Sequence, residues 1–217
     1  MNKHITMGGE EPFTERQEAV LDAALALLVA GGEKAITTAR IARAANCSKE
    51  SLYKWFGDRD GILAAMITYQ ASKVRVPAGS DTVLRPLEAY VSDFQSFGVD
   101  LLTVLSGPTS MALNRLAIGQ ASAEGSALGS LLIARGRSSV RARATALLDR
   151  AKLAGHVRFD DVNDAFHTLY GLIVADGHVR SLLGEQVSFL TQPNMRKAHV
   201  NKAIDAFFAL YGSQTNH

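Results

Sequence analysis

The chain has 217 residues, 47% of them hydrophobic and 20% charged, which is enough to bury a sizeable core and excludes wholesale disorder. The single cysteine, Cys47, excludes an internal disulfide and a zinc site built from several cysteines, and it favours a cytoplasmic protein. The longest uncharged stretch, Leu101–Asn114, has 14 residues, fewer than the roughly 18 that a membrane span needs. The net charge of +2 does not indicate whether the protein binds nucleic acid, so the distribution of charge along the chain has to be considered.

Few β-branched residues and only five prolines predict an all-α fold. Residues 1–12 have no apolar core and are interpreted as a flexible tail rather than a secretory signal. The stretch Val74–Pro86 mixes Pro, Gly, Ser and Asp, which predicts a boundary there. We therefore expect a small helical domain over 13–75 and a larger helical domain over 76–217.

Local capping signals divide the first domain into helices. Thr14 and Gln17 form a capping-box pattern before a helix that ends at Gly31-Gly32, and a short helix follows over about 38–45. Asn46 tolerates the left-handed conformation of a tight turn, and Ser48 can cap a third helix over 49–56. These features predict a helix-turn-helix, with a fourth helix beginning at Arg59 after an Asp58 cap.

The larger domain is predicted to be a series of amphipathic helices separated by glycine and proline. The expected helices span about 81–105, 108–120, 126–154, 160–183 and 193–211.

Positive charge is concentrated in the predicted helix-turn-helix. Thr37–Arg59 has five basic and two acidic residues, a local net charge of +3 that exceeds the charge of the whole chain. Its third helix has the right size for a DNA major groove if Leu52 and Phe56 point inward. The alternative is the solvated face of an ordinary helical bundle, which charge alone does not exclude. The side chains presented outward would be Ser48, Lys49, Ser51, Tyr53 and Lys54.

The segment TTARIARAANCSKESLYKWFGDRDGIL, Thr37–Leu63, resembles the N-terminal DNA-binding domain of TetR-family transcriptional regulators. Two threonines open the second helix, a small-residue turn precedes Ser48, and S-K-x-S-L-Y-x-W-F-G followed by D-R-D leads into the fourth. The resemblance covers about residues 14–69; the remainder is similar only in its rhythm of helices. Asn46 stands where glycine is usual, and Cys47 stands where valine is usual.

The resemblance implies roles for individual residues. Thr37 and Thr38 would touch phosphate, and Trp55 and Arg59 would hold the DNA backbone. Glu50 would either accept a hydrogen bond from a cytosine amine or favour the helix N-terminus through the helix dipole. Cys47 is either a packing residue or, as a sharper alternative, a redox sensor. The groove or its walls would be faced by Ser48, Lys49, Ser51 and Tyr53, and Lys54 belongs to the same basic patch.

The resemblance also implies an effector pocket and a dimer interface in the larger domain. The apolar majority of the candidate pocket residues suggests a small, largely apolar effector. The alternative for the two apolar stripes proposed as the interface is that they only close the core of one chain. The candidate pocket residues are Phe94, Phe97, Met111, Arg115, His167 and Tyr170. The candidate interface residues are Phe166, Ile173, Val200, Ile204, Phe207, Phe208 and Tyr211.

Two further patterns leave alternatives open. His156, His167 and His178 recur every 11 residues, which suits pocket or interface histidines better than a metal site, because no carboxylate or cysteine joins them at ligand spacing. Four arginines between Gly125 and Leu148 are either a solvated face or a counter-charge for an anionic effector: Arg135, Arg137, Arg141 and Arg143.

The resemblance, together with these features, implies a homodimeric regulator that binds a near-palindromic DNA operator and is released by its effector. Repression is the commoner outcome in the resembled family, and activation is the alternative that the sequence leaves open. We expect no cofactor, no metal and no membrane partner. An enzyme is not expected, because the sequence has no G-x-S-x-G, P-loop or H-E-x-x-H motif. A protein that coats DNA without an effector is the third possibility, and it would leave the long helical C-terminal region unexplained.

Overall fold

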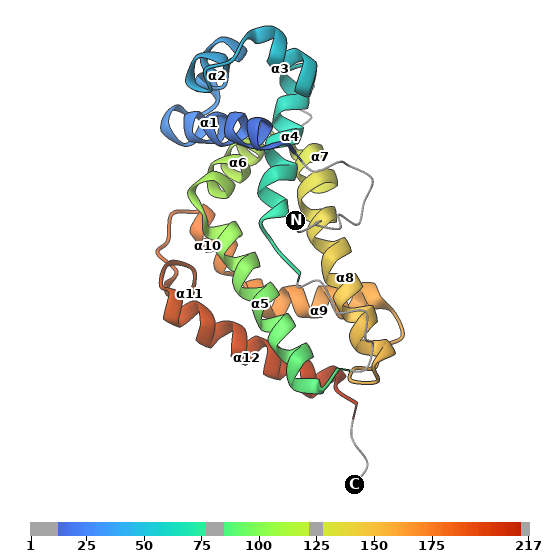
Figure 1. Ribbon diagram of the computed structural model, residues 1–217. Helices are drawn as coiled ribbons and strands as arrows, with labels where there is room; N and C mark the ends of the chain where they lie inside the picture. The colour runs from blue at the N-terminus through green and yellow to red at the C-terminus, as the bar shows by residue number, and fades with distance from the viewer. Residues whose placement is uncertain (1–12, 77–84, 122–127, 214–217) are drawn as a thin grey trace. The chain divides into compact units, whose positions relative to one another are not determined.

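The computed structural model describes residues 13–76, 85–121 and 128–213 (Figure 1). Within these ranges the regular structure is helical apart from an isolated antiparallel bridge between Val157 and Gly212. The predicted all-α fold is confirmed, whereas the predicted tail over 1–12 lies outside the described residues. None of the helices in the described ranges combines the length and the hydropathy required to cross a membrane.

Four helices follow one another at the start of the described chain: α1 (Glu15–Gly31), α2 (Thr38–Ala44), α3 (Lys49–Phe56) and α4 (Arg59–Ser72). A 3-10 turn, η1 (Glu33–Ala35), joins α1 to the Thr37 cap and was not predicted. The capping box of Thr14 and Gln17 and the caps at Ser48 and Asp58 are present as the sequence predicts. Short-range capping chemistry therefore sets the ends of these helices.

The chain folds into two compact units, neither of which is continuous in sequence. The first combines the chain up to Lys73 with Gly107–Ser139, and the second combines Val74–Ser106 with Val140–His217. In the first unit α1–α4 pack with α6 (Pro108–Gly119), α7 (Leu128–Leu131) and the π-helix η2 (Leu132–Arg137). Leu113 and Ala117 of α6 join the buried cluster that α1–α4 form.

The second unit contains α5 (Leu87–Ser106), most of α8 (Ser138–Leu153), α9 (Val162–Val174), α10 (Gly177–Leu182), α11 (Ser188–Thr191) and α12 (Pro193–Tyr211). Its core is rich in phenylalanine: Phe94 of α5 packs against Phe207 and Phe208 of α12, with ring centroids 5.8 and 5.5 Å apart. Phe166 of α9 is part of the same cluster. The apolar stripes predicted on α9 and α12 thus contribute to the core of a single chain.

The single helix predicted over 160–183 is wrong, because the chain breaks between α9 and α10. Ala175 adopts a φ of 48°, a left-handed conformation that ends α9, and Gly177 restarts the helix against the ring of Phe189. A Cβ on Gly177 would lie 2.3 Å from that ring, so a larger residue there would force the ring of Phe189 to move. Val179 is consequently 60% exposed instead of extending the apolar stripe of α9.

The helix predicted over 126–154 is interrupted by the π-helical turn of η2 and continues as α8. Gly136 of η2 approaches Ile67 of α4 closely, since a Cβ at this position would lie 3.3 Å from the Ile67 side chain. The predicted last helix, 193–211, matches α12. The helix predicted over 81–105 corresponds to α5, which begins at Leu87, and residues 81–84 lie outside the described residues.

Candidate nucleic-acid interface

Helix α3 buries one face and exposes the other, as the sequence predicts. Leu52 is fully buried and Phe56 is 9% exposed, and both belong to the core of the first unit. Tyr53 is 54% exposed, and Lys49 at the start of the helix and Lys54 are exposed as well. A short rod with two apolar anchors and a basic, aromatic outer face has the dimensions that a major groove admits.

The turn before α3 has the conformation that its sequence predicts. Asn46 lies in the left-handed region with φ 48°, and the amide of Cys47 donates to the carbonyl of Ala42 at 2.9 Å. The hydroxyl of Ser48 accepts from the amide of Ser51 at 3.1 Å and so caps α3. The Ser48 hydroxyl also lies 3.1 Å from the hydroxyl of Ser51, so the two serines of this turn are hydrogen-bonded to each other.

A contact from α1 that was not predicted completes this turn. The Nη2 atom of Arg16 donates to the carbonyls of Ala45 and Asn46 at 2.9 and 2.6 Å. These partners lie 29 and 30 residues further along the chain, so no local pattern predicts the contact.

Glu50 stands in the first turn of α3, next to the Ser48 cap. Its pKa lies below the ordinary glutamate value because its own backbone N–H and the Ser48 side chain donate to the carboxylate, with Lys49 adding a favourable charge. This geometry supports the interpretation of Glu50 as a residue that favours the helix N-terminus.

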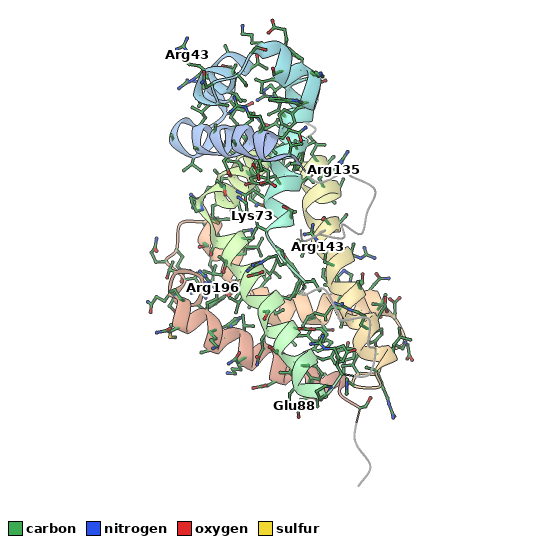
Figure 2. All side chains as sticks on the ribbon, viewed as in Figure 1. Arg43, Lys73, Glu88, Arg135, Arg143 and Arg196 are labelled. Atoms are coloured by element: carbon green, nitrogen blue, oxygen red, sulfur yellow. The ribbon has the colours of Figure 1, made fainter. Side chains whose placement is uncertain are left out.

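The two threonines stand at the start of α2. Thr37 is exposed and accepts from the amide of Arg40 at 3.3 Å as the N-cap, while Thr38 is half-buried. Two exposed arginines of α2, Arg40 and Arg43, add to the positive charge, and Figure 2 shows Arg43 extending outward from the helix.

The two residues predicted to hold the DNA backbone are engaged within the protein. Trp55 is half-buried and meets the ring of Phe56 edge-on, with centroids 6.2 Å apart. The Nη2 atom of Arg59 lies 2.8 Å from a carboxylate oxygen of Glu33, and the two side chains are 48% and 41% exposed. Arg59 is therefore accessible but already paired, which the sequence did not reveal.

Cys47 is a free, half-buried thiol at the edge of the first core cluster. This position fits the packing interpretation, and its redox role stays a hypothesis.

The candidate pocket residues do not gather in one unit. Met111 and the exposed Arg115 belong to the first unit, and the other four belong to the second. Phe94 and Phe97 are fully buried in the second core, whereas His167 is exposed and Tyr170 half-buried. Their role in binding an effector stays a prediction.

Most of the candidate interface residues are inside one chain. A side chain without exposed surface cannot touch a partner chain, so these residues belong to the core of their own chain. Contacts between two chains would come from exposed residues next to them. Phe208 and Tyr211 are half-buried and still reach the surface. The residues no more than 2% exposed are Phe166, Ile173, Val200, Ile204 and Phe207.

The regular spacing of the histidines does not place them on one helix face. His167 lies on α9 and His178 lies on α10, on either side of the break at Ala175. His156 bonds through Nε2 to the carbonyl of Arg85 at 2.8 Å and packs on the ring of Tyr90. Burial lowers the pKa of His178. In the described ranges no group of three or more His, Cys, Asp or Glu side chains is arranged to hold a metal ion.

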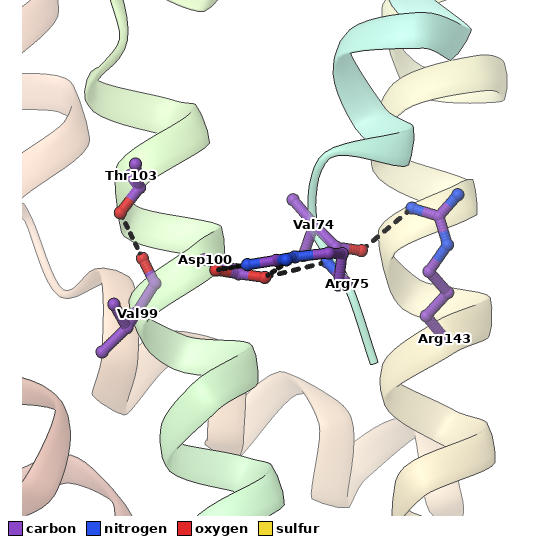
Figure 3. Close-up of polar contacts among 6 residues, drawn as sticks. All are labelled: Val74, Arg75, Val99, Asp100, Thr103 and Arg143. Atoms are coloured by element: carbon purple, nitrogen blue, oxygen red, sulfur yellow. Dashed lines mark hydrogen bonds and ion pairs between the residues drawn. The ribbon is translucent and has the colours of Figure 1, made fainter. Parts of the chain in front are cut away.

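Arg141 and Arg143, two of the four arginines near α8, make polar contacts in the second unit. Arg141 donates to the side-chain oxygen of Asn163. Arg143 donates to the carbonyl of Val74 at 3.3 Å, and burial lowers its pKa (Figure 3). Arg135 is exposed on η2, and Figure 2 marks its position.

The segment directly after α4 is held by the hydrogen bond from Arg143 to Val74 and by an ion pair. Figure 3 shows Arg75 facing Asp100 of α5, with its Nε atom 3.0 Å from a carboxylate oxygen. The backbone amide of Arg75 donates to the same oxygen at 3.3 Å. We call Val74, Arg75, Asp100 and Arg143 the linker clamp.

The capped turn, the exposed basic face of α3 and its two buried anchors define a helix-turn-helix DNA-binding protein. Residues 20–66 match the family model described as "Bacterial regulatory proteins, tetR family". Residues 92–213 match the model described as "AefR-like transcriptional repressor, C-terminal domain". The chain belongs to the TetR family of transcriptional regulators, and it is a DNA-binding regulator.

Solved structures agree with this assignment. A TetR transcriptional regulator from Agrobacterium tumefaciens is 52% identical, with 93% of this chain and 97% of that one covered and a TM-score of 0.80. A putative TetR-family regulator from Mesorhizobium loti is 20% identical over 91% and 96% of the chains, with a TM-score of 0.70, and shares the fold. The flavonoid-responsive regulator FrrA shares it at 21% identity over 92% and 98%, with a TM-score of 0.64. Among curated proteins no sequence matches this chain.

Proposed function

We propose that this regulator is a homodimeric repressor that binds a near-palindromic operator through α3 and is released by a small, largely apolar effector. The observation that carries the proposal is the orientation of α3, which buries Leu52 and Phe56 and leaves Lys49 and Tyr53 at the surface. Lys49 begins the helix, where recognition helices contact base edges. The match of residues 92–213 to a repressor's C-terminal domain supports repression as the outcome.

A homodimer would place two α3 helices in successive major grooves, about 34 to 36 Å or a multiple of this apart. We expect the contacts between chains to come from the outward faces of α9 and α12. Leu210, near the end of α12, is 68% exposed, and Phe208 and Tyr211 of the same helix are half-buried. Apolar side chains that reach the surface are the kind that a second copy would cover.

Release by an effector requires two states of the protein that differ in DNA affinity. The phenylalanine-rich core of the second unit suits an apolar effector. The linker clamp could couple effector binding to α4. Val74 and Arg75 follow α4 directly in the chain and are hydrogen-bonded to α8 and α5. A ligand that displaces α5 or α8 would move the segment that follows α4.

Binding to DNA from upstream of the protein's own gene tests the proposal. Lys49→Ala and Tyr53→Ala should each weaken the binding by about 5- to 150-fold, the equivalent of about 1 to 3 kcal/mol per lost base contact. Arg158→Ala, which removes an exposed basic side chain of the second unit outside α9 and α12, is the matched control and should leave the affinity unchanged. Equally weak binding by the wild type and all variants would contradict the role of α3.

The alternative function, coating of DNA without an effector, gives a different result in the same binding experiment. A protein that coats DNA without an effector would show a steep salt dependence and no preference for the operator. Effector binding is tested by a thermal-shift screen against small apolar metabolites, because a ligand of the folded state raises the melting temperature. Loss of operator binding on addition of a stabilising compound would support the proposal, and its persistence at saturation would contradict it.

A further inference from the structure

Arg16 lies in the first turn of α1 and reaches the turn between α2 and α3. A single nitrogen, Nη2, donates to the carbonyls of Ala45 and Asn46 at 2.9 and 2.6 Å. Ala45 is the C-cap of α2, and Asn46 is the left-handed residue of the turn. Arg16 therefore contacts the carbonyls on either side of the Cα atom that carries the unusual φ.

The amides and the carbonyls of this turn are satisfied by different helices. The amides of Asn46 and Cys47 donate to the carbonyls of Arg43 and Ala42, so α2 holds them. The carbonyls of Ala45 and Asn46 accept hydrogen bonds from Arg16 of α1. A guanidinium at this point also complements the negative end of the α2 dipole.

A left-handed conformation is strained for a residue with a side chain, and it persists only where the surroundings fix it. Glycine would take the same φ without this penalty. Since Asn46 is two residues before Ser48 and three before Lys49, a change at the turn shifts the start of α3. The first residues of a recognition helix are the ones that meet base edges, so such a shift affects sequence recognition first.

We propose that Arg16 is a positioning residue for operator recognition: it fixes the Asn46 turn to α1, and thereby the start of α3, without contacting phosphate. The inference rests on the proposed function, because it concerns discrimination between the operator and other DNA. Through Arg16, helix α1 contributes to sequence specificity although the turn that it contacts lies about 30 residues further along the chain.

The first experiment compares operator and random duplexes for the wild type, Arg16→Gln and Arg16→Lys over a series of salt concentrations. Arg16→Gln should lose about tenfold in operator affinity, the lower end of the range for a lost hydrogen bond to a charged group, with less than about twofold loss on the random duplex. Arg16→Lys keeps the charge and a donor and should recover part of the loss. Arg158→Gln, at an exposed arginine of the second unit, is the matched control.

The dependence of the affinity on salt separates positioning from phosphate contact. If Arg16 only positions the turn, the slope of log affinity against log salt stays the same in Arg16→Gln. Loss of about 0.9 from the slope per site, with equal weakening on both duplexes, would assign Arg16 to a phosphate and overturn the proposal. An unchanged operator affinity would overturn it as well.

A second measurement needs no DNA, so its failure is distinguishable from failure of the proposed function. Hydrogen exchange of the free protein reports on the amides of Cys47 and Ser51, which are bonded to the Ala42 carbonyl and the Ser48 hydroxyl. Arg16→Gln should make these amides exchange several-fold faster, while amides in the middle of α4 keep their rates. Unchanged exchange at the turn would show that Arg16 does not hold it, whatever the wild type does with the operator.

Discussion

The ion pair between Arg59 and Glu33 gives a quantitative prediction about DNA affinity. If Arg59 holds a phosphate, as the resemblance to the TetR family implies, it has to leave Glu33, from which its Nη2 atom is 2.8 Å away. Both side chains are close to half-exposed, at 48% and 41%, so the pair contributes about 0.2 to 1 kcal/mol. Glu33→Gln removes that competitor, and the affinity for operator DNA should rise by at most about fivefold.

Fluorescence anisotropy with a labelled operator duplex measures this gain. Arg59→Gln should weaken binding and reduce the salt slope by about 0.9 per lost phosphate contact. The decisive control is the double variant, because Glu33→Gln should have no effect once Arg59 is gone. An equal gain in the Arg59→Gln background would mean that Glu33 acts by general charge repulsion, and a loss of affinity in Glu33→Gln would refute the reasoning.

Three further predictions concern the fold that supports the site. Leu52→Ala, at a fully buried position of α3, should lower the free energy of unfolding by about 2 to 5 kcal/mol, seen as a lower urea midpoint; an unchanged midpoint would contradict the buried position. Asp100→Asn removes the anion that raises the pKa of Arg75, and it should speed tryptic cleavage after Arg75. The melting temperature should change only slightly, because an exposed ion pair contributes about 0 to 1 kcal/mol to stability. Burial, followed by the hydrogen bond to Asp22, raises the pKa of Tyr69 to about 12. Its stabilising contribution should be complete below pH 10 and should be lost as the pH rises towards 12; Tyr69→Phe should remove the latest step of the tyrosinate absorbance titration and this part of the pH dependence.

The helix-turn-helix could be predicted from the sequence because its signals are local. Ser48 caps the amide of Ser51 three residues away, and Asp58 caps that of Gly61 over the same distance. Asn46 adopts the left-handed turn that its residue type favours. The contacts of Arg16 and Arg59 join residues 26 to 30 positions apart, so they depend on packing that no short pattern contains.

The second unit was less predictable for physical reasons of two kinds. The break at Ala175 places a left-handed alanine where no glycine or proline marks the end of α9. The stripes on α9 and α12 were apolar as expected, yet a core and an interface between chains use the same residue types. Only the structure shows that Phe207 is fully enclosed by its own chain while Leu210, three residues later, is 68% exposed.

DNA cleavage from a reagent tethered to α3 tests the role of this helix most directly. Cys47 is the chain's single cysteine, so Cys47→Ser leaves a background in which Tyr53→Cys carries an iron chelate on the exposed face of α3. Cleavage of the operator should then occur in two clusters about one or more helical turns apart. The same reagent at Arg158→Cys, an exposed position of the second unit before α9, should cut little. Equal, unlocalised cleavage from both positions, or none from position 53 on a bound operator, would contradict recognition through α3.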